Sequence, residues 1–216
     1  MRVAFVGKGG VGKSSLAGTF ARVLARTGER VLALDSDPMP GLAFSLGVDR
    51  DDAGLPDDVV ESLAGWQLRE LGGRAVPPGN LHVTLAFLGS RPGSDLKRVA
   101  GAVREAADRA ERPELGVLGY RETRSVGMLV CDDRDGRAAA LADDLFGRLE
   151  ALGVYARERS GWLPHVTVTR FRERPRLDPE LPALGRFSPS DAAVYLSRLH
   201  PSGAQYEVLE SFALGG

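Results

Sequence analysis

Two short segments of the chain repeat one arrangement of residue types, a histidine and a threonine separated by one residue inside an apolar run. The segments are NLHVTLAFLG and LPHVTVTRFR. In an extended strand alternate side chains share a face, so we expect His82 to lie beside Thr84 and His165 beside Thr167. If the two strands lie side by side, two imidazoles and two hydroxyls surround one small site.

These residue types suit phosphoryl chemistry. The ordinary histidine pKa of ~6.5 lets one ring be neutral and the other charged near neutral pH. The neutral ring can accept a proton from water while the charged ring donates one to a leaving oxygen. Threonine hydroxyls can donate hydrogen bonds to nonbridging oxygens, on which charge develops. The repeat therefore predicts acid–base catalysis on a phosphate ester that needs no metal, and no metal site is expected.

Other residues near the repeat are weaker candidates. Arg170 follows Thr167 by three positions, so in a regular strand it would face away from the site and reaches a phosphate only if the strand bulges or ends there. Trp66 and Trp162 are of a type that is more often packed in a core, and Trp162 is the better candidate for contacting a nucleotide. The stretch RFRERPR could follow an RNA backbone or could be a solvated loop.

The opening stretch FVGKGGVGKSS matches the phosphate-loop pattern G-x-x-x-x-G-K-[ST] between an apolar run and a helical pattern. Backbone N–H groups of Gly9, Gly10 and Gly12 would close on phosphate oxygens. Lys13 would neutralise their charge, and Ser14 would bind magnesium. ATP with magnesium is therefore a candidate ligand of this loop, although the repeat itself requires no cofactor.

Apolar periodicity predicts the elements that position these residues. The first 48 residues indicate strand, loop, helix and strand, and the aspartate-rich segment after them is a linker. A helix follows in which Val60, Leu63, Gln67 and Leu71 share a face. Further helices are predicted over 96–107 and 141–152, and strands over 81–88, 114–120, 127–131, 165–171, 192–199 and 206–214. This irregular order favours an α+β fold with mostly antiparallel sheets.

Composition limits the partners. The 216 residues carry 28 basic and 29 acidic side chains, a net charge of -1, so a polyanion site must be local and neither DNA nor a membrane is an expected partner. The longest apolar run is too short for a signal peptide or a membrane span. The single cysteine, Cys131, cannot form an internal disulfide, which favours a reducing, cytoplasmic location.

The opening resembles ParA/MinD-type ATPases in its loop and in VLALDSDPMPGLAFSLGV, over about residues 1–48. An ATPase of this kind needs several more parallel strands, and no apolar strand ending in D-x-x-G follows. We therefore interpret residues 1–48 as a truncated segment, residues 49–55 as a linker and residues 56–216 as a second domain.

The second domain resembles the 2H phosphoesterases, specifically the bacterial RNA 2′,3′-cyclic phosphodiesterases once named 2′-5′ RNA ligases. The resemblance lies in LPDDVVESLAGWQ, PPGNLHVTLAFLG, LPHVTVTRFR and LSRLHPSGAQYEVLESFAL. It implies a bilobal fold with two mostly antiparallel sheets around a cleft, and hydrolysis of a cyclic phosphate to a 2′-phosphate. His82 would be the acid and His165 the base, with Thr84, Thr167 and Arg170 holding the phosphate.

The expected partner is RNA with a 2′,3′-cyclic phosphate end, or a small cyclic nucleotide, bound by a monomer. Two alternatives remain open at this point: a ParA/MinD-like ATPase, and a non-catalytic module that binds RNA ends. This family normally opens with a strand before the LPDD-type helix, which here is preceded by GVDRDDAG. We hypothesise that a strand from residues 2–47 fills that place.

Overall fold

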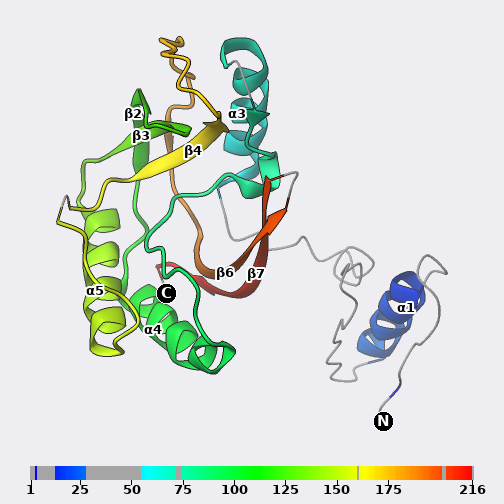
Figure 1. Ribbon diagram of the computed structural model, residues 1–216. Coiled ribbons are helices and arrows are strands. Elements are labelled where there is room, and N and C mark those ends of the chain that lie inside the picture. The colour runs from blue at the N-terminus through cyan, green and yellow to red at the C-terminus, as the bar shows by residue number, and fades with distance from the viewer. Residues whose placement is uncertain are drawn as a thin grey trace. The chain divides into compact units, whose positions relative to one another are not determined.

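The computed structural model describes residues 3, 13–27, 55–71, 74–159, 161–200 and 203–215 (Figure 1). The chain divides into two compact units, Met1–Asp52 and Ala53–Gly216, each taken here by itself. In the first unit the described element is α1 (Lys13–Arg26), which confirms the predicted helix. The strands predicted on either side of it, and the strand proposed to fill the missing place, lie outside the described residues.

The second unit mixes helices and antiparallel strands. Its helices are α3 (Asp57–Glu70), α4 (Leu96–Arg109) and α5 (Arg137–Ala151), with 3-10 turns at Pro78–Asn80 and Gly93–Asp95. Its strands are β1 (Arg74–Ala75), β2 (Leu115–Glu122), β3 (Val126–Asp133), β4 (His165–Arg170), β5 (Arg186–Phe187), β6 (Asp191–His200) and β7 (Gly203–Ala213). One sheet has the order β1-β4-β3-β2-β5, and β6 pairs with β7 in a second. The pairings are antiparallel, which confirms the predicted α+β class.

Each sheet has its own apolar core, and this gives the unit its two lobes. In the first lobe α3 packs Leu63 and Trp66 against Leu129 and Val168 of the five-stranded sheet. In the second lobe α4 and α5 lie next to each other with β6 and β7 beside α4, and their core is formed by Val99, Val103, Ala107, Leu145, Leu149, Ala192 and Leu214 (Figure 1). Within the described part of the chain, no helix has the length and apolar character needed to cross a membrane.

The face of α3 that packs on the sheet differs from the predicted one. Val59 and Trp66 are buried there with Leu63 and Gln67, whereas Val60 is only half-buried. Gln67 lies on the predicted face and on the observed one, and its side-chain amide donates hydrogen bonds to the carbonyls of Val76 (3.1 Å) and Val168 (2.6 Å). A buried amide needs such partners, and Gln67 finds them on β4 and on the residue directly after β1.

The predicted strand over 81–88 is wrong in extent. The segment is extended but pairs through one bridge, between Val83 and Val166. Farther along, the hydrogen-bonding edge of β4 is occupied by β1 and by the N–H of Val76. The carbonyl of Thr84 accepts a hydrogen bond from the side chain of Trp162 instead of from a strand. A continuous ladder therefore has no room to form. The strands predicted over 114–120, 127–131, 165–171, 192–199 and 206–214 and both longer helices are confirmed, while the two-residue strands β1 and β5 were not predicted.

A bulge lies near the end of β4. Gly127 of β3 is opposite Thr169 while its neighbour Met128 is opposite Thr167, so β4 carries one extra residue between the two threonines. Gly127 is required here, because an added Cβ would come 2.7 Å from the methyl carbon of Thr169 and would meet the hydroxyl of Tyr120. Thr169 is fully buried and has no room to shift.

We therefore predict that Gly127→Ala destabilises the protein by about 1–3 kcal/mol, the usual cost of overpacking a core. The measurement is urea unfolding followed by tryptophan fluorescence. Gly119→Ala is the matched control, because a Cβ on Gly119 of the same hairpin meets nothing within 4 Å. Equal midpoints for the two variants would contradict the packing described above.

Candidate active site

The two histidine–threonine segments meet at one backbone pairing. Val83 and Val166 form an antiparallel bridge, and both pack against the core of the first lobe. Because alternate residues of an extended chain face opposite sides, the residues that flank each valine face away from that core. They are His82 and Thr84 on one segment and His165 and Thr167 on the other.

The antiparallel register fixes how these four side chains are arranged. With Val83 opposite Val166, His82 comes opposite Thr167 and Thr84 comes opposite His165. The two imidazoles therefore occupy diagonal corners of a four-residue face, where residues are typically ~7–8 Å apart and their Cβ atoms somewhat closer. That spacing leaves room between the rings for one phosphate group.

A cavity of about 480 Å³ opens over this face. Its walls include His82, Thr84, His165 and Thr167, and also Arg170. In a regular strand Arg170 would face away from them, but the bulge after Thr167 changes the alternation. The structure thus brings all five sequence-predicted residues of the repeat to one cavity.

Each histidine is oriented by its own segment. Nδ1 of His82 lies 2.8 Å from the carbonyl oxygen of Asn80, and Nδ1 of His165 lies 2.8 Å from that of Leu163. A carbonyl can only accept, so each Nδ1 carries the proton and donates it. This leaves Nε2 of both rings as the nitrogen that can exchange a proton with a ligand. In both copies of the repeat, the histidine Nδ1–H therefore donates to the carbonyl two residues earlier in the chain.

The two rings differ in their surroundings. His82 stacks on the ring of Tyr195, with centroids 5.4 Å apart, and meets the ring of Tyr206 edge-on at 5.0 Å. Burial lowers the pKa of His82. The bond to Asn80 acts in the opposite direction, while the positive charges of His165 and Arg170 lower the pKa further. In the free protein these surroundings favour the neutral form of His82.

The two tyrosines come from the β6–β7 hairpin, and the sequence analysis did not identify them as part of the site. They are more than a hundred residues from His82, and Tyr195 and Tyr206 carry no motif of their own. The alternation of apolar and polar residues along β6 and β7 could have placed them on one face, but not against a particular histidine.

Trp162 joins the two segments a second time. Its indole N–H donates a hydrogen bond of 3.0 Å to the carbonyl of Thr84, and its ring lines the cavity. Trp66 is instead a core residue, as expected, with its N–H bonded to the carbonyl of Glu180 at 2.6 Å.

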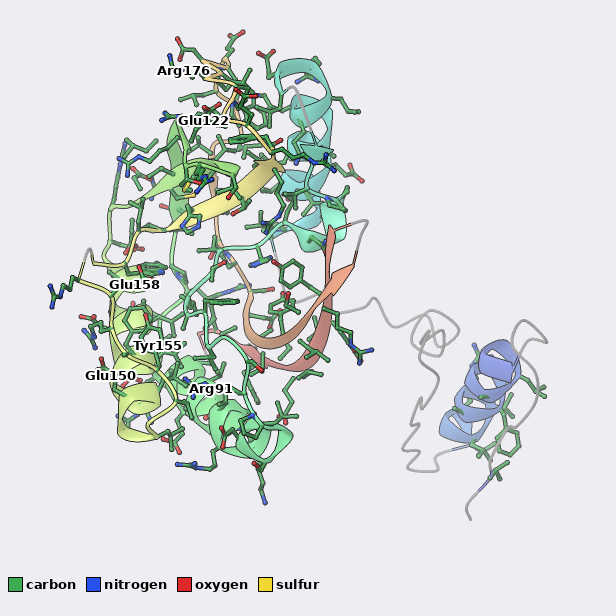
Figure 2. The ribbon with its side chains drawn as sticks, viewed as in Figure 1. Arg91, Glu122, Glu150, Tyr155, Glu158 and Arg176 are labelled. Carbon is green, nitrogen blue, oxygen red and sulfur yellow. The ribbon has the colours of Figure 1, made fainter. Side chains whose placement is uncertain are left out.

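The cavity also has an aromatic end. Phe87, Phe146 and Tyr155 lie there with Arg157 and Glu158, and Figure 2 places Tyr155 and Glu158 beside α5. The guanidinium of Arg157 lies over the ring of Phe146, 5.3 Å from its centre, and pairs with Asp143. Flat apolar surfaces next to a polar phosphate-sized site suit a nucleoside attached to a phosphate.

Three other residues of chemically reactive type, Cys131, Asp132 and Asp133, have structural surroundings. Burial raises the pKa of the Cys131 thiol to about 12, so it is not a nucleophile. The carboxylate of Asp133 accepts the backbone N–H groups of Ala138 and Ala139 at the start of α5. Asp132 pairs with Arg186 at 3.0 Å.

The predicted phosphate loop falls largely outside the described residues. Gly9, Gly10 and Gly12 are not among them. Lys13 and Ser14 form the first turn of α1, and their side chains are likewise outside what the structure describes.

Comparison with known proteins agrees with this geometry. The RNA 2′,3′-cyclic phosphodiesterase of Thermus thermophilus is 33% identical over 175 residues, which cover 75% of this chain and 87% of the relative. The crystal structure of TT0787 from the same organism superposes with a TM-score of 0.60 at 29% identity, covering 76% of this chain and 96% of that one. E. coli LigT in its apo form has a TM-score of 0.62 at 21% identity, covering 76% and 95%.

A second similarity concerns the opening of the chain. The family model of the CobQ/CobB/MinD/ParA nucleotide binding domain matches residues 3–177. The carbon monoxide dehydrogenase accessory protein CooC of Rhodospirillum rubrum is 47% identical over 66 residues, 30% of this chain and 25% of the relative. The chain spans about a quarter of the length of each of the first two curated relatives it matches.

The chain belongs to the 2H phosphoesterases, and by sequence also to the CobQ/CobB/MinD/ParA nucleotide-binding family. The resemblances stated from the sequence are confirmed for both parts. The second unit of this 2H phosphoesterase has the LigT-type fold.

The environment of His82 leads to a prediction about its titration. We expect its imidazole to titrate below ~6.5, the ordinary value, and Tyr206→Ser to raise the midpoint because water then reaches the ring. The measurement is an NMR titration of the histidine ring C–H resonances. Tyr155→Ser is the matched control, since Tyr155 lines the same cavity at the aromatic end. A midpoint that Tyr206→Ser leaves unchanged would show that the hairpin does not desolvate His82.

Proposed function

We propose that this 2H phosphoesterase hydrolyses 2′,3′-cyclic phosphate ends of RNA to 2′-phosphates. The observation that carries the proposal is the diagonal placement of His82 and His165 over one cavity, each with Nε2 available for proton transfer. The similarity to the RNA 2′,3′-cyclic phosphodiesterase of Thermus thermophilus supports the substrate, and E. coli LigT has been crystallised with 3′-AMP.

In the proposed reaction the cyclic phosphate lies between the two imidazoles. His165 takes a proton from a water molecule, whose oxygen attacks phosphorus, and the bond from phosphorus to O3′ breaks. His82 gives its Nε2 proton to O3′, so the product keeps its phosphate on O2′. This assignment of acid and base follows the family resemblance, and the geometry suits it because the two rings approach from opposite corners.

Three further side chains would stabilise the charge that builds on the nonbridging oxygens. Thr84 and Thr167 line the cavity beside the histidines and supply hydroxyl donors. Arg170 supplies a guanidinium whose two parallel N–H groups match phosphate geometry. None of these steps assigns a role to a metal.

The lowered pKa of His82 is compatible with its role as acid. The free protein favours the neutral ring, but an anionic phosphate placed between the rings favours the charged one, since an opposite charge nearby raises a histidine pKa. Substrate binding would therefore favour the protonated form of His82, which is the form that acts as the acid. A histidinium held in surroundings that disfavour its charge also gives up its proton readily.

We predict that His82→Ala and His165→Ala each lower kcat by about 10²- to 10⁴-fold, the usual contribution of a positioned acid or base. The substrate is 2′,3′-cyclic AMP in the presence of EDTA, and the product is identified by 31P NMR. His200→Ala is the control, because His200 belongs to neither repeat.

Turnover should persist in EDTA and give 2′-AMP. A 3′-phosphate product, or full activity in the double variant His82→Ala with His165→Ala, would contradict the proposal. Tight binding of cyclic-phosphate ends by the wild type without turnover would instead indicate a module that only binds RNA ends.

A second proposal concerns the opening loop, which we infer binds the phosphates of ATP with magnesium but does not hydrolyse ATP. It is supported by the nucleotide-binding family match and by the start of α1 at Lys13, directly after Gly12. Hydrolysis is not proposed because an ATPase of this kind needs more parallel strands, and the described pairings of the second unit are antiparallel.

Lys13→Ala should therefore weaken binding of Mg·ATP by at least tenfold, measured by isothermal titration calorimetry. Arg170→Ala is the companion variant, because it alters the phosphoesterase cavity and leaves the loop unchanged. Loss of Mg·ATP binding only in Arg170→Ala would place the nucleotide in the cavity. Magnesium-dependent release of phosphate from ATP that Lys13→Ala abolishes would support an ATPase.

A further inference from the structure

Two loops at one end of the five-stranded sheet bring exposed arginines together. The turn between β2 and β3 is joined to the loop after β4 by a hydrogen bond of 3.0 Å from the N–H of Phe171 to the carbonyl of Ser125. The arginines on these two stretches are all exposed: Arg121, Arg124, Arg170, Arg172, Arg174 and Arg176. We call this set the arginine corner.

The arginine corner is strongly positive in a chain that is otherwise balanced. Residues 120–126 and 170–177 hold six arginines and two glutamates, Glu122 and Glu173, a local charge of +4 against -1 for the whole protein. Within the described residues, the ion pair that involves a member of the set is that between Arg174 and Glu122. The other guanidinium groups remain available to an external anion.

A buried carboxylate fixes the position of these arginines. The side chain of Glu122 is 2% exposed and accepts hydrogen bonds from Nε of Arg174 (3.1 Å), the N–H of Arg176 (3.0 Å) and the N–H of Leu177 (2.8 Å). Tyr120 donates a fourth from its hydroxyl at 3.3 Å. Figure 2 shows Glu122 and Arg176 at the same end of the molecule.

The charge and the backbone at this contact both indicate a fixed loop. Burial alone would raise the pKa of Glu122, but the hydrogen bonds outweigh it and leave the pKa lowered, so the carboxylate stays charged. Arg176 adopts a φ of 59°, a left-handed conformation that costs a non-glycine residue free energy. A merely solvated loop would need neither a buried anchor nor this backbone conformation.

The arginine corner is continuous with the candidate active site. Arg170 lines the cavity, and its Cα pairs with that of Val126 at the start of β3, directly after the turn that carries Arg124. Arg172 follows two residues later. A polyanion whose end occupies the cavity would therefore meet the corner as it leaves.

We propose that the arginine corner holds the backbone phosphates of an RNA strand whose 3′ end, the cyclic phosphate, lies between His82 and His165. The inference rests on the proposed function and specifies its substrate class as oligonucleotides rather than free cyclic nucleotides. Arginine suits this task because its planar guanidinium binds phosphate oxygens in pairs. The contacts would be independent of base sequence.

The test compares two substrates with the same terminal nucleoside, 2′,3′-cyclic AMP and an RNA decamer that ends in adenosine 2′,3′-cyclic phosphate. The variant is Arg124→Gln with Arg172→Gln and Arg176→Gln. We expect its kcat/KM on the decamer to fall at least tenfold through KM, and its kcat/KM on 2′,3′-cyclic AMP to be unchanged. The slope of log kcat/KM against log salt for the decamer should become shallower by about 2, since each phosphate contact on a single strand contributes ~0.7.

The matched control removes three exposed arginines from α4 and the loop before it, Arg91→Gln with Arg104→Gln and Arg109→Gln, and so changes the net charge equally. An equal loss on the decamer in both triple variants would overturn the inference, because it would show a general charge effect. An unchanged kcat/KM on the decamer in the first triple variant would also overturn the inference. Absence of turnover of either substrate by the wild type would overturn the proposed function itself. Equal kcat/KM on both substrates, unaffected by the variant, would overturn only the proposed binding of RNA at the arginine corner.

Discussion

The candidate site depends on one backbone pairing, that of Val83 with Val166. Both valines pack into the same core, so the register between the two segments is fixed by apolar burial. A slip by one residue would turn an imidazole into that core and a valine into the cavity, which is why a half-buried strand holds its register strongly. The bond from Trp162 to the carbonyl of Thr84 supports the same alignment.

The pairing makes the two histidines equivalent in geometry, and the second lobe makes them unequal in environment. Each ring is held through Nδ1 by a carbonyl two residues earlier in its own segment. The β6–β7 hairpin then places the rings of Tyr195 and Tyr206 against His82, and burial lowers the pKa of that ring. In the free protein this cover favours the neutral ring, so the proposed role of His82 as the acid depends on the anionic phosphate of the substrate, which raises a nearby histidine pKa.

How far the site could be predicted from the sequence depends on how far apart along the chain the residues of each contact lie. The alternation within HVT places His82 with Thr84, and His165 with Thr167, because a strand has a period of two. The contribution of Arg170 depended on a bulge in β4 opposite Gly127 and Met128, and no residue type in the local sequence indicates that bulge. The tyrosines of the hairpin and the anchor at Glu122 are contacts between distant segments, and one sequence does not specify them.

The same reasoning applies to elements of the fold. Long periodic segments such as α4 and α5 were predicted because their apolar residues repeat every three or four positions. The two-residue strands β1 and β5 are too short to show any period. The segment over 81–88 has the composition of a strand, but β1 and a tryptophan side chain take the partners that would have completed its ladder.

Two family memberships in one chain need not imply two enzymes. The nucleotide-binding match runs to residue 177, well into the second unit. Yet the described strand pairs of that unit are antiparallel, whereas a phosphate-loop ATPase places its catalytic groups at the carboxyl ends of parallel strands. Sequence similarity there does not supply the sheet that ATP hydrolysis requires. Whatever the opening loop binds, the arrangement of the cavity in the second unit follows from the Val83–Val166 pairing.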